Sequence, residues 1–243
     1  GRTWTVASAG YTGAQVRAIA VDPDDPARVL SAARSGLFTS NDGGSSWTGL
    51  SFQPAFHLEW NAVALDPANP HHVLAANNWD SGLFQSTDGG KTWRETERRL
   101  QEMMGWRVIA FAPSEPNTVY AGSSAFFSAG GFDDRMAAAG IYASRDGGGT
   151  WDAANDALSA QANVTDLAVD PRDPLVVYAA TGSGVLKTSD GGWGWTKPTD
   201  GLPGSSHALS VAVHPFEPDV VVAGFWHSGL YRSEDGGASW RPA

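Results

Sequence analysis

Two acidic side chains are the residues of this sequence whose chemistry best suits the cleavage of a sugar bond. Most glycoside hydrolases place two carboxyl groups about 5 Å or about 6.5–9.5 Å apart, one on each side of the scissile bond. Glu59 and Asp80 form the best candidate pair, and Asp133 and Asp134 form a second one. A glycoside hydrolase is therefore one function that the sequence allows.

A second set of side chains favours binding without catalysis. Tryptophan and arginine are common anchors of interfaces and sugar sites, because each joins a large flat surface to a polar group. Four of the 11 tryptophans lie outside the repeated motif described next, with arginine, histidine and asparagine residues near them in the chain. The candidate ligand-binding residues are Arg17, Arg34, His57, Trp60, Asn78, Trp79, Trp106, Arg107, Trp226 and His227.

One pattern, first present at residues 36–47, occurs five times and organises the chain. It contains Gly, an aliphatic and a bulky apolar residue, Ser or Thr, Asp-Gly-Gly, a small residue and Trp. The apolar residues suit a strand, and Asp-Gly-Gly suits a hairpin turn with positive φ. The Asp carboxylate can accept backbone N–H bonds in that turn, braced by the Ser or Thr. We expect structural roles for Asp42, Asp88, Asp146, Asp190, Asp235, Trp47, Trp93, Trp151, Trp195 and Trp240.

This pattern resembles the Asp-box, or BNR, repeat of sialidases, sortilin-type receptors, xyloglucan-degrading glycosidases and photosystem II assembly factors. The resemblance covers the whole chain and implies a β-propeller. It also implies that the Asp-box is a hairpin at the blade periphery, away from the ligand face. Function does not follow, because proteins that carry the repeat do unrelated things.

The intervals between the motifs also suit propeller blades. Successive Asp-box aspartates are 46, 58, 44 and 45 residues apart, as four-stranded blades require. We predict one all-β domain over 1–243, a β-propeller of four-stranded antiparallel blades. Five blades are expected, with part of a larger propeller as the alternative. The repeats are expected at about 15–50, 59–97, 106–155, 163–198 and 207–243.

The chain ends raise the question of how the ring closes. Residues 1–9 match the second half of a further repeat, so we expect the chain to begin inside a repeat. Unpaired blade edges favour association with other chains. We therefore expect either closure, with Thr3 to Val6 beside the strands of the fifth repeat, or self-association through the ends.

The predicted topology separates two faces of the propeller. In each repeat a Pro-x-x-Pro turn follows the first strand, and this turn and the Asp-box turn must share one face. The linkers between blades and the loops between second and third strands share the opposite face. The candidate binding residues fall there, although Trp60 and Trp106, at the starts of inner strands, could instead pack between blades. Arg17, Arg34 and Arg107 could converge there as sialidase arginines do, but the Arg-Ile/Leu-Pro element of those enzymes is missing.

Composition narrows the possible partners. The formal net charge of −10 argues against nucleic acid, and no apolar run suits a membrane helix. We expect a glycan or protein ligand, no metal and no cofactor, with His71 and His72 facing solvent. A secreted or periplasmic bacterial protein is the expected setting. The sequence thus favours a non-catalytic binding propeller, with a sialidase-like or xyloglucanase-like glycoside hydrolase, or a fragment of one, as the alternative.

Overall fold

The structure is a computed structural model of the 243-residue chain. It describes residues 3, 5–10, 15–50, 59–77, 82–96, 105–123, 140–154, 163–204 and 207–243. Every named element in these ranges is a β-strand. Accordingly, the described residues contain no helix of the length and apolarity that crossing a membrane requires.

The described strands form five antiparallel sheets, each made of consecutive strands, which we call blades one to five. Blade one contains β1 (Val16–Val21), β2 (Val29–Ala33), β3 (Gly36–Ser40) and β4 (Thr48–Gly49). Blade two contains β5 (Trp60–Asp66), β6 (Asn69–Asn77), β7 (Leu83–Ser86) and β8 (Arg94–Glu95). Blade three contains β9 (Trp106–Phe111), β10 (Val119–Ser123), β11 (Ile141–Ser144) and β12 (Asp152–Ala153). Blade four contains β13 (Val164–Val169), β14 (Val177–Thr181) and β15 (Gly184–Thr188). Blade five contains β16 (Ala208–Val213), β17 (Val221–Phe225), β18 (Gly229–Ser233) and β19 (Arg241–Pro242).

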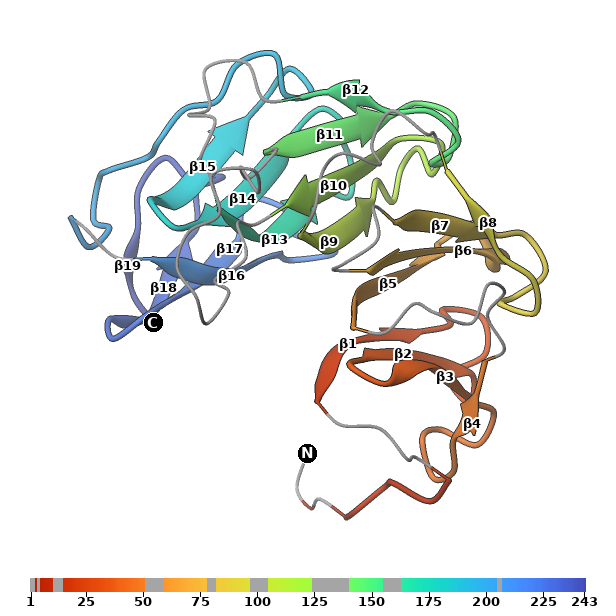
Figure 1. Cartoon of the computed structure of the whole chain (residues 1–243). Coiled ribbons are helices and arrows are strands. Elements are labelled where there is room, and N and C mark those ends of the chain that lie inside the picture. Colours follow the sequence, from red (N-terminus) through yellow and green to blue (C-terminus); the bar gives the residue numbers. More distant parts are fainter. Residues whose placement is uncertain are drawn as a thin grey trace, which may run out of the picture.

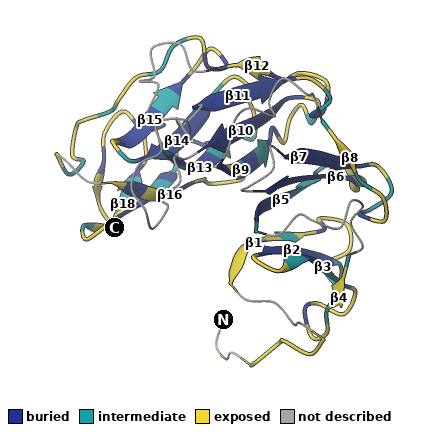
Figure 2. Ribbon diagram, in the orientation of Figure 1, coloured by how far each residue is buried: buried dark blue, intermediate teal, exposed yellow. Residues whose placement is uncertain are grey.

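The blades follow one another round an arc (Figure 1). The first strands β1, β5, β9, β13 and β16 pack against each other in that order. Apolar side chains fill the space between successive blades, so the buried strands lie in the middle of the arc (Figure 2). Between blades one and two, for example, Leu30 packs with Trp60 and Phe84. This arrangement confirms the predicted all-β propeller.

The arc is open, since the described strands of blades one and five do not pack on one another (Figure 1). Ile19 of β1 is 60% exposed, whereas Val63 and Ile109, at the same position of blades two and three, are 7% and 8% exposed. Leu230 of blade five is 56% exposed, whereas its counterpart Val185 is fully buried. The structure therefore matches part of a propeller rather than a closed ring of five blades.

The N-terminal segment lies on blade one and not beside blade five, so the predicted ring closure through Thr3 to Val6 is wrong. The Trp47 backbone N–H donates to Ala9 O (2.7 Å), and its indole Nε1–H donates to Ala7 O (3.0 Å). The linker before blade five makes the same backbone contact, from Trp240 N–H to Asp200 O (3.0 Å). The segment is held by its own blade because it has the position of an interblade linker.

Candidate functional site

Backbone hydrogen bonds define the two faces. On one face the Pro-x-x-Pro turn meets the Asp-box turn, as where Gly43 N–H donates to Ala27 O (2.8 Å). On the other face the linker meets the loop between second and third strands, as where Arg34 N–H donates to Gln15 O (3.0 Å). We call these the turn face and the loop face. These bonds confirm the prediction that the two kinds of turn share one face, and that the linkers share the other face with the loops between second and third strands.

The Asp-box carboxylates hold their own turns together. Asp42 Oδ1 accepts hydrogen bonds from Ser40 Oγ (2.7 Å) and Ser46 N–H (2.8 Å), and Asp42 Oδ2 accepts one from Ser46 Oγ (2.6 Å). These bonds from Ser46 and Ser40 lower the pKa of Asp42 to about 2. Asp235 makes the same bonds with Ser239 and Ser233, and its pKa is also lowered to about 2. The carboxylates are thus committed to the turns and not to a ligand.

The Asp-box turns also connect neighbouring blades. Gly236 O, in the turn of blade five, accepts hydrogen bonds from Tyr178 Oη (2.8 Å) and Lys187 Nζ (2.7 Å) of blade four. Arg28 of blade one donates in the same way to Gly89 O of blade two (3.2 Å). Burial, followed by nearby carboxylates, raises the pKa of Tyr178 to about 12, so this hydroxyl remains a donor at neutral pH. The turn face is therefore built for cohesion between blades.

His72 corrects one expectation about that face. It is 8% exposed rather than solvent-facing. Its Nδ1 lies 3.0 Å from Asp66 Oδ2, and its Nε2 lies 2.6 Å from the Gln85 side-chain amide, which also donates to Gly147 O of blade three (3.2 Å). His72 thus belongs to an interblade network.

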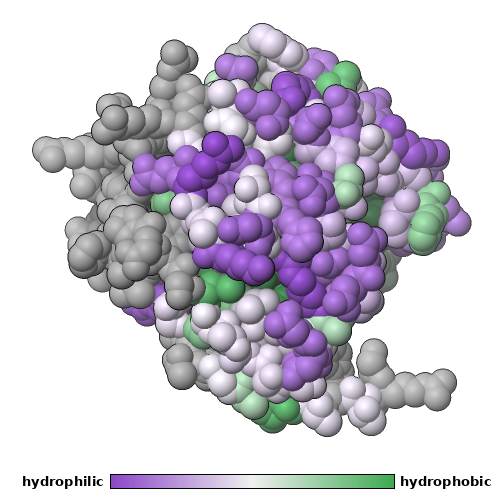
Figure 3. All heavy atoms as spheres, turned by 90° about the vertical axis from the view of Figure 1, so that its right-hand side faces the viewer, coloured by the Kyte–Doolittle hydropathy of each residue, from purple (hydrophilic) through white to green (hydrophobic). Residues whose placement is uncertain are grey.

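Two grooves on the outer edges of the described blades lie at equivalent places between neighbouring blades. A groove of about 340 Å³ beside Gln85 and Arg94 recurs between the next two blades as a groove of about 200 Å³ beside Ala143 and Asp152. Features that recur from blade to blade are architecture. The side of the molecule on the right in Figure 1 is mainly hydrophilic in its described part (Figure 3).

Two of the four tryptophans outside the Asp-boxes are core residues. Trp60 is 1% exposed and its ring centroid lies 5.3 Å from that of Phe84. Trp106 is fully buried, 5.7 Å from the ring of Tyr142. Their indoles fill the space between blades, so neither presents a surface to a ligand, contrary to the expectation for these two residues.

The candidate catalytic pair is only partly within the described chain. His57, Asn78, Trp79, Asp80, Asp133 and Asp134 lie outside the described residues. Glu59 is described, and its Oε1 lies 2.7 Å from Nε of Arg34. This ion pair joins blades one and two on the loop face. Its backbone is left-handed, with φ of 67°. Glu59 is therefore an ion-paired residue on a strained backbone.

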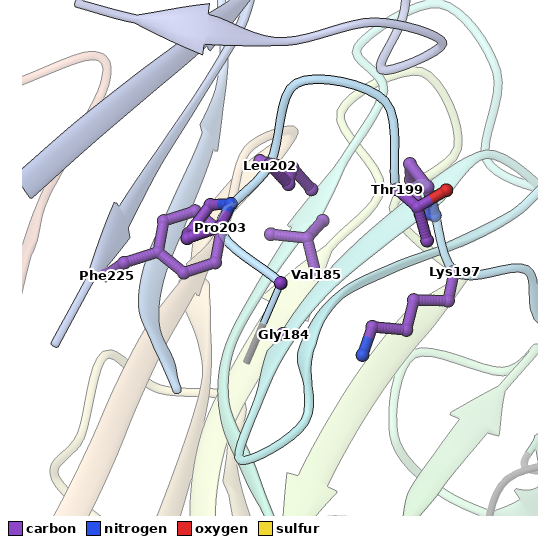
Figure 4. A pocket seen from close by; sticks show the side chains of 9 residues that line it. Gly184, Val185, Lys197, Thr199, Leu202, Pro203 and Phe225 are labelled. Atoms are coloured by element: carbon purple, nitrogen blue, oxygen red, sulfur yellow. The ribbon is translucent and has the colours of Figure 1, made fainter. Parts of the chain in front are cut away.

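Blade five carries an exposed aromatic side chain on the loop face. Trp226 is 57% exposed, and its ring centroid lies 4.9 Å from that of His227, which also has a positive φ, 60°. Behind this loop lies a cavity of about 50 Å³. Figure 4 shows Val185 and Leu202 between Phe225 on one side of this cavity and Lys197 on the other.

A β-bulge occurs at the same position of every inner strand. In β1 the register passes from Val16 directly to Ala18, which leaves Arg17 unpaired, and the same shift occurs in the four other blades. The bulged residues are Arg17, Asn61, Arg107, Thr165 and Leu209. Bulges re-aim side chains and often lie beside functional sites. The bulged residues lie near the start of each inner strand, at its loop-face end.

Two bulged residues bind the next blade. Asn61 Nδ2–H donates to Trp106 O (2.8 Å), and Thr165 Oγ1–H donates to Ala208 O (2.8 Å). Sequence analysis missed Asn61 and Lys197 as site residues. An alignment of the five repeats contained the signal for Asn61, because it shares its position with Arg17 and Arg107.

Two of the five bulged residues, Arg17 and Arg107, are positively charged, and none of the five is negatively charged. Burial lowers the pKa of Arg107 below its usual value, and the charge of Arg17 lowers it further. The described residues contain no group of three or more His, Asp and Glu side chains placed to hold a metal ion.

Comparison with known structures supports the fold. An ancestral GH74 enzyme matches 99% of this chain at 21% identity and a TM-score of 0.76, and the match covers 33% of that enzyme. The GH74 xyloglucanase from Xanthomonas campestris matches 93% of this chain at 20% identity and a TM-score of 0.69, over 38% of its own length. YCF48 bound to D1 peptide matches 95% of this chain at 16% identity and a TM-score of 0.57, over 81% of its length.

These likenesses establish the fold alone, because the identities are low. The chain spans about one third of the GH74 enzymes that it matches. Comparison with protein-family models and with curated proteins finds no match. Hydrolases and a peptide-bound protein thus share the β-propeller architecture with this chain.

Proposed function

We propose that this chain is a non-catalytic binding propeller that recognises a protein segment or a glycan through its loop face. One observation carries the proposal. Among the described residues, Glu59 and His227 are the two non-glycine residues with positive φ, and both belong to the loop face. Such backbone strain costs about 1–3 kcal/mol per residue and is typically retained at functional sites.

Further features of the loop face support the proposal. Trp226 offers an exposed aromatic surface beside His227, and Arg34 and Arg17 bring cationic groups to the same face. The turn face also exposes aromatic side chains, Trp193 (73%) and Phe216 (88%), but its Asp-box carboxylates are bound within their own turns. YCF48 bound to D1 peptide is a propeller with a peptide ligand. A binding role on this fold is therefore consistent with a related architecture.

The alternative is a glycoside hydrolase, favoured by the likeness to GH74 enzymes. The ion pair of Glu59 with Arg34 weighs against it, because a general acid with a raised pKa needs an apolar or anionic setting and not a bound guanidinium. Asp80 lies outside the described residues.

Binding and turnover are tested on one protein sample. It is applied to a glycan array and a peptide array and is incubated with xyloglucan and a sialoside, with product release measured. Saturable binding without turnover is expected. Trp226→Ala should weaken that binding, whereas Asp88→Ala on the turn face should lower the melting temperature and leave binding per folded molecule unchanged. Turnover, or loss of binding by Asp88→Ala alone, would refute the proposal.

We also propose self-association through the open ends of the arc, with a second copy as the partner. β1 and blade five expose the apolar positions that other blades bury against a neighbour, including Ile19, Val21 and Leu230. The exposed apolar surface of blade one in one copy can therefore pack against that of blade five in another copy. Sedimentation velocity should show a dimer or larger species that Ile19→Lys dissociates. A monomer at every concentration would refute this.

A secreted or periplasmic location also stays a prediction.

A further inference from the structure

One of the two outer-edge grooves differs from the other in the side chains that line it. The groove of about 200 Å³ between blades three and four is lined by Trp193, where the groove between blades two and three has Gly149. We call it the Trp193 groove. The same position is Ser45, Lys91 and Ala238 in the remaining Asp-boxes, so the turn does not require an aromatic residue there. Trp193 is nevertheless 73% exposed, and exposed indoles are typical of binding surfaces.

The two walls of the Trp193 groove are fixed to each other. Ala154, at the edge of blade three, accepts a hydrogen bond at its carbonyl oxygen from Trp195 Nε1–H of blade four (2.9 Å). A Cβ atom on Gly192 would lie 2.6 Å from the Cβ of Ala154, so the turn of blade four packs directly on that edge. In blades two, three and five the Asp-box indole donates instead to its own turn. The Trp193 groove is therefore preorganised, which reduces the conformational entropy lost on binding.

Arg145 and Asp152 bring opposite charges to the Trp193 groove. Both side chains are exposed, and within the described chain they form no ion pair with each other. The Arg145 guanidinium lies 5.7 Å from the ring centre of Tyr120, and its Nη1 donates to Thr118 Oγ1 (3.3 Å). A guanidinium has more N–H donors than these contacts use, and a carboxylate is an acceptor. The groove thus offers a ligand both donors and an acceptor.

Polar side chains of the groove between blades two and three are engaged in contacts within the protein. Arg94, which occupies the position of Asp152, donates from Nε to Gln85 Oε1 (3.1 Å). Gln85 in turn donates to Gly147 O of blade three (3.2 Å). The Asp152 carboxylate accepts no hydrogen bond of this kind from the described residues. The two grooves therefore share their shape, but cohesion between blades does not account for the side chains of the Trp193 groove.

From this arrangement we propose that the Trp193 groove binds a neutral glycan, with one sugar ring stacked on the Trp193 indole. The sugar hydroxyl groups donate to the Asp152 carboxylate and accept from the Arg145 guanidinium, because a hydroxyl does both. The two opposite charges balance, which favours a neutral ligand over an acidic one. The buried floor consists of alanine and glycine residues, which suit the flat face of a sugar ring better than the protruding anchor side chain of a peptide. This site goes beyond the proposed function, because it lies at the outer edge of the turn face.

NMR of the tryptophan indole Nε1–H signals tests the proposal on the whole chain. The neutral probes are maltotetraose, cellotetraose and mannotetraose, with tetragalacturonate as the acidic counterpart. We expect at least one neutral probe to move the Trp193 signal, and tetragalacturonate to bind more weakly. Trp193→Ala should raise the Kd of that neutral probe at least about tenfold. Asp152→Asn should raise it by a smaller factor, because the amide oxygen still accepts a hydrogen bond.

Phe216→Ala is the matched control, because it removes an 88% exposed aromatic side chain from another part of the turn face. It should leave the Kd within about twofold. Trp193→Ala should melt like the parent, since blade five has Ala238 at the same position. The proposal would be overturned if no neutral probe moved the Trp193 signal, if Trp193→Ala left the Kd unchanged, or if tetragalacturonate bound more tightly than the neutral probes.

The groove site and the proposed loop-face function fail in different ways. A glycan held in the Trp193 groove should lose its array signal in Trp193→Ala and keep it in Trp226→Ala, and a loop-face ligand should show the reverse. If the neutral probes move the Trp226 signal alone, the loop-face function stands and the groove site is wrong. If they move the Trp193 signal alone and Trp226→Ala changes no array signal, the groove site stands and the loop-face function is wrong.

Discussion

The hydrogen bond from Tyr178 to the Asp-box turn of blade five gives a quantitative test of how blades are held together. Tyr178→Phe removes the Oη bond to Gly236 O (2.8 Å) and keeps the shape of a side chain that is 1% exposed. Lys187 Nζ still donates to the same carbonyl (2.7 Å), so no buried acceptor is left unpaired. The net loss should be about 1 kcal/mol, the usual value of one hydrogen bond.

Thermal unfolding followed by circular dichroism measures this loss. A change of about 1 kcal/mol should lower the melting temperature by roughly 2–4 °C in a protein of this size. Tyr231→Phe is the control, since the Tyr231 hydroxyl makes no hydrogen bond within the described residues while its ring packs 5.4 Å from Phe225. It should melt like the parent.

A double variant makes the test stricter. Tyr178→Phe with Lys187→Met leaves Gly236 O without either donor, and an unpaired buried acceptor costs about 1–3 kcal/mol. The double variant should therefore lose more than the sum of the two single variants. Strict additivity, or a Tyr178→Phe that melts like Tyr231→Phe, would refute the idea that this turn fastens blade five to blade four.

Three further predictions concern pH and the N-terminal segment. Asp42 has a lowered pKa of about 2, so its stabilising effect is complete above the ordinary value of 3.8 and is lost as pH falls through about 2; Asp42→Asn should lower the melting temperature at pH 6, with a difference from the parent that shrinks toward pH 2. Tyr178 has a raised pKa of about 12, so the parent should lose stability as pH rises from 10 toward 12, whereas Tyr178→Phe should show a smaller loss in alkaline thermal melts. Deletion of residues 1–9 removes the two hydrogen bonds to Trp47 and should cost on the order of 1–2 kcal/mol in urea unfolding; an unchanged midpoint would show that this contact contributes nothing.

The repeated hairpin could be predicted from the sequence because its determinants are local. Asp42, Ser40 and Ser46 lie within seven residues of chain, and Gly43 and Gly44 have the positive φ that their turn requires. Local patterns of this kind specify each blade. They do not specify whether the first and last blades meet, because closure depends on contacts across the whole chain. The exposure of Ile19 and Leu230 depends on the distance between the first and last blades, which no single repeat specifies.

The candidate site was harder to predict because exposure depends on the neighbouring blade. Trp60 and Trp106 carry the residue type of a binding surface, yet their position in the repeat is occupied by buried Val164 and Ala208 in later blades. That comparison within the sequence favours a core position. His72 illustrates the same limit, since only the contact with blade three buries its ring beside Gln85.

Repetition also separates the residues that build the propeller from those that distinguish it. Where five blades agree, as at the Asp-box aspartates, one structural explanation serves all five. At the inner-strand bulge the backbone is the same in every blade while the side chains are Arg, Asn, Arg, Thr and Leu. Architecture requires the bulge but not the charge, because Thr165 performs the interblade bond without one. The side chain at this position therefore distinguishes one blade from another on the loop face, and Arg17 and Arg107 are the residues to change first when the part of this position in binding is tested.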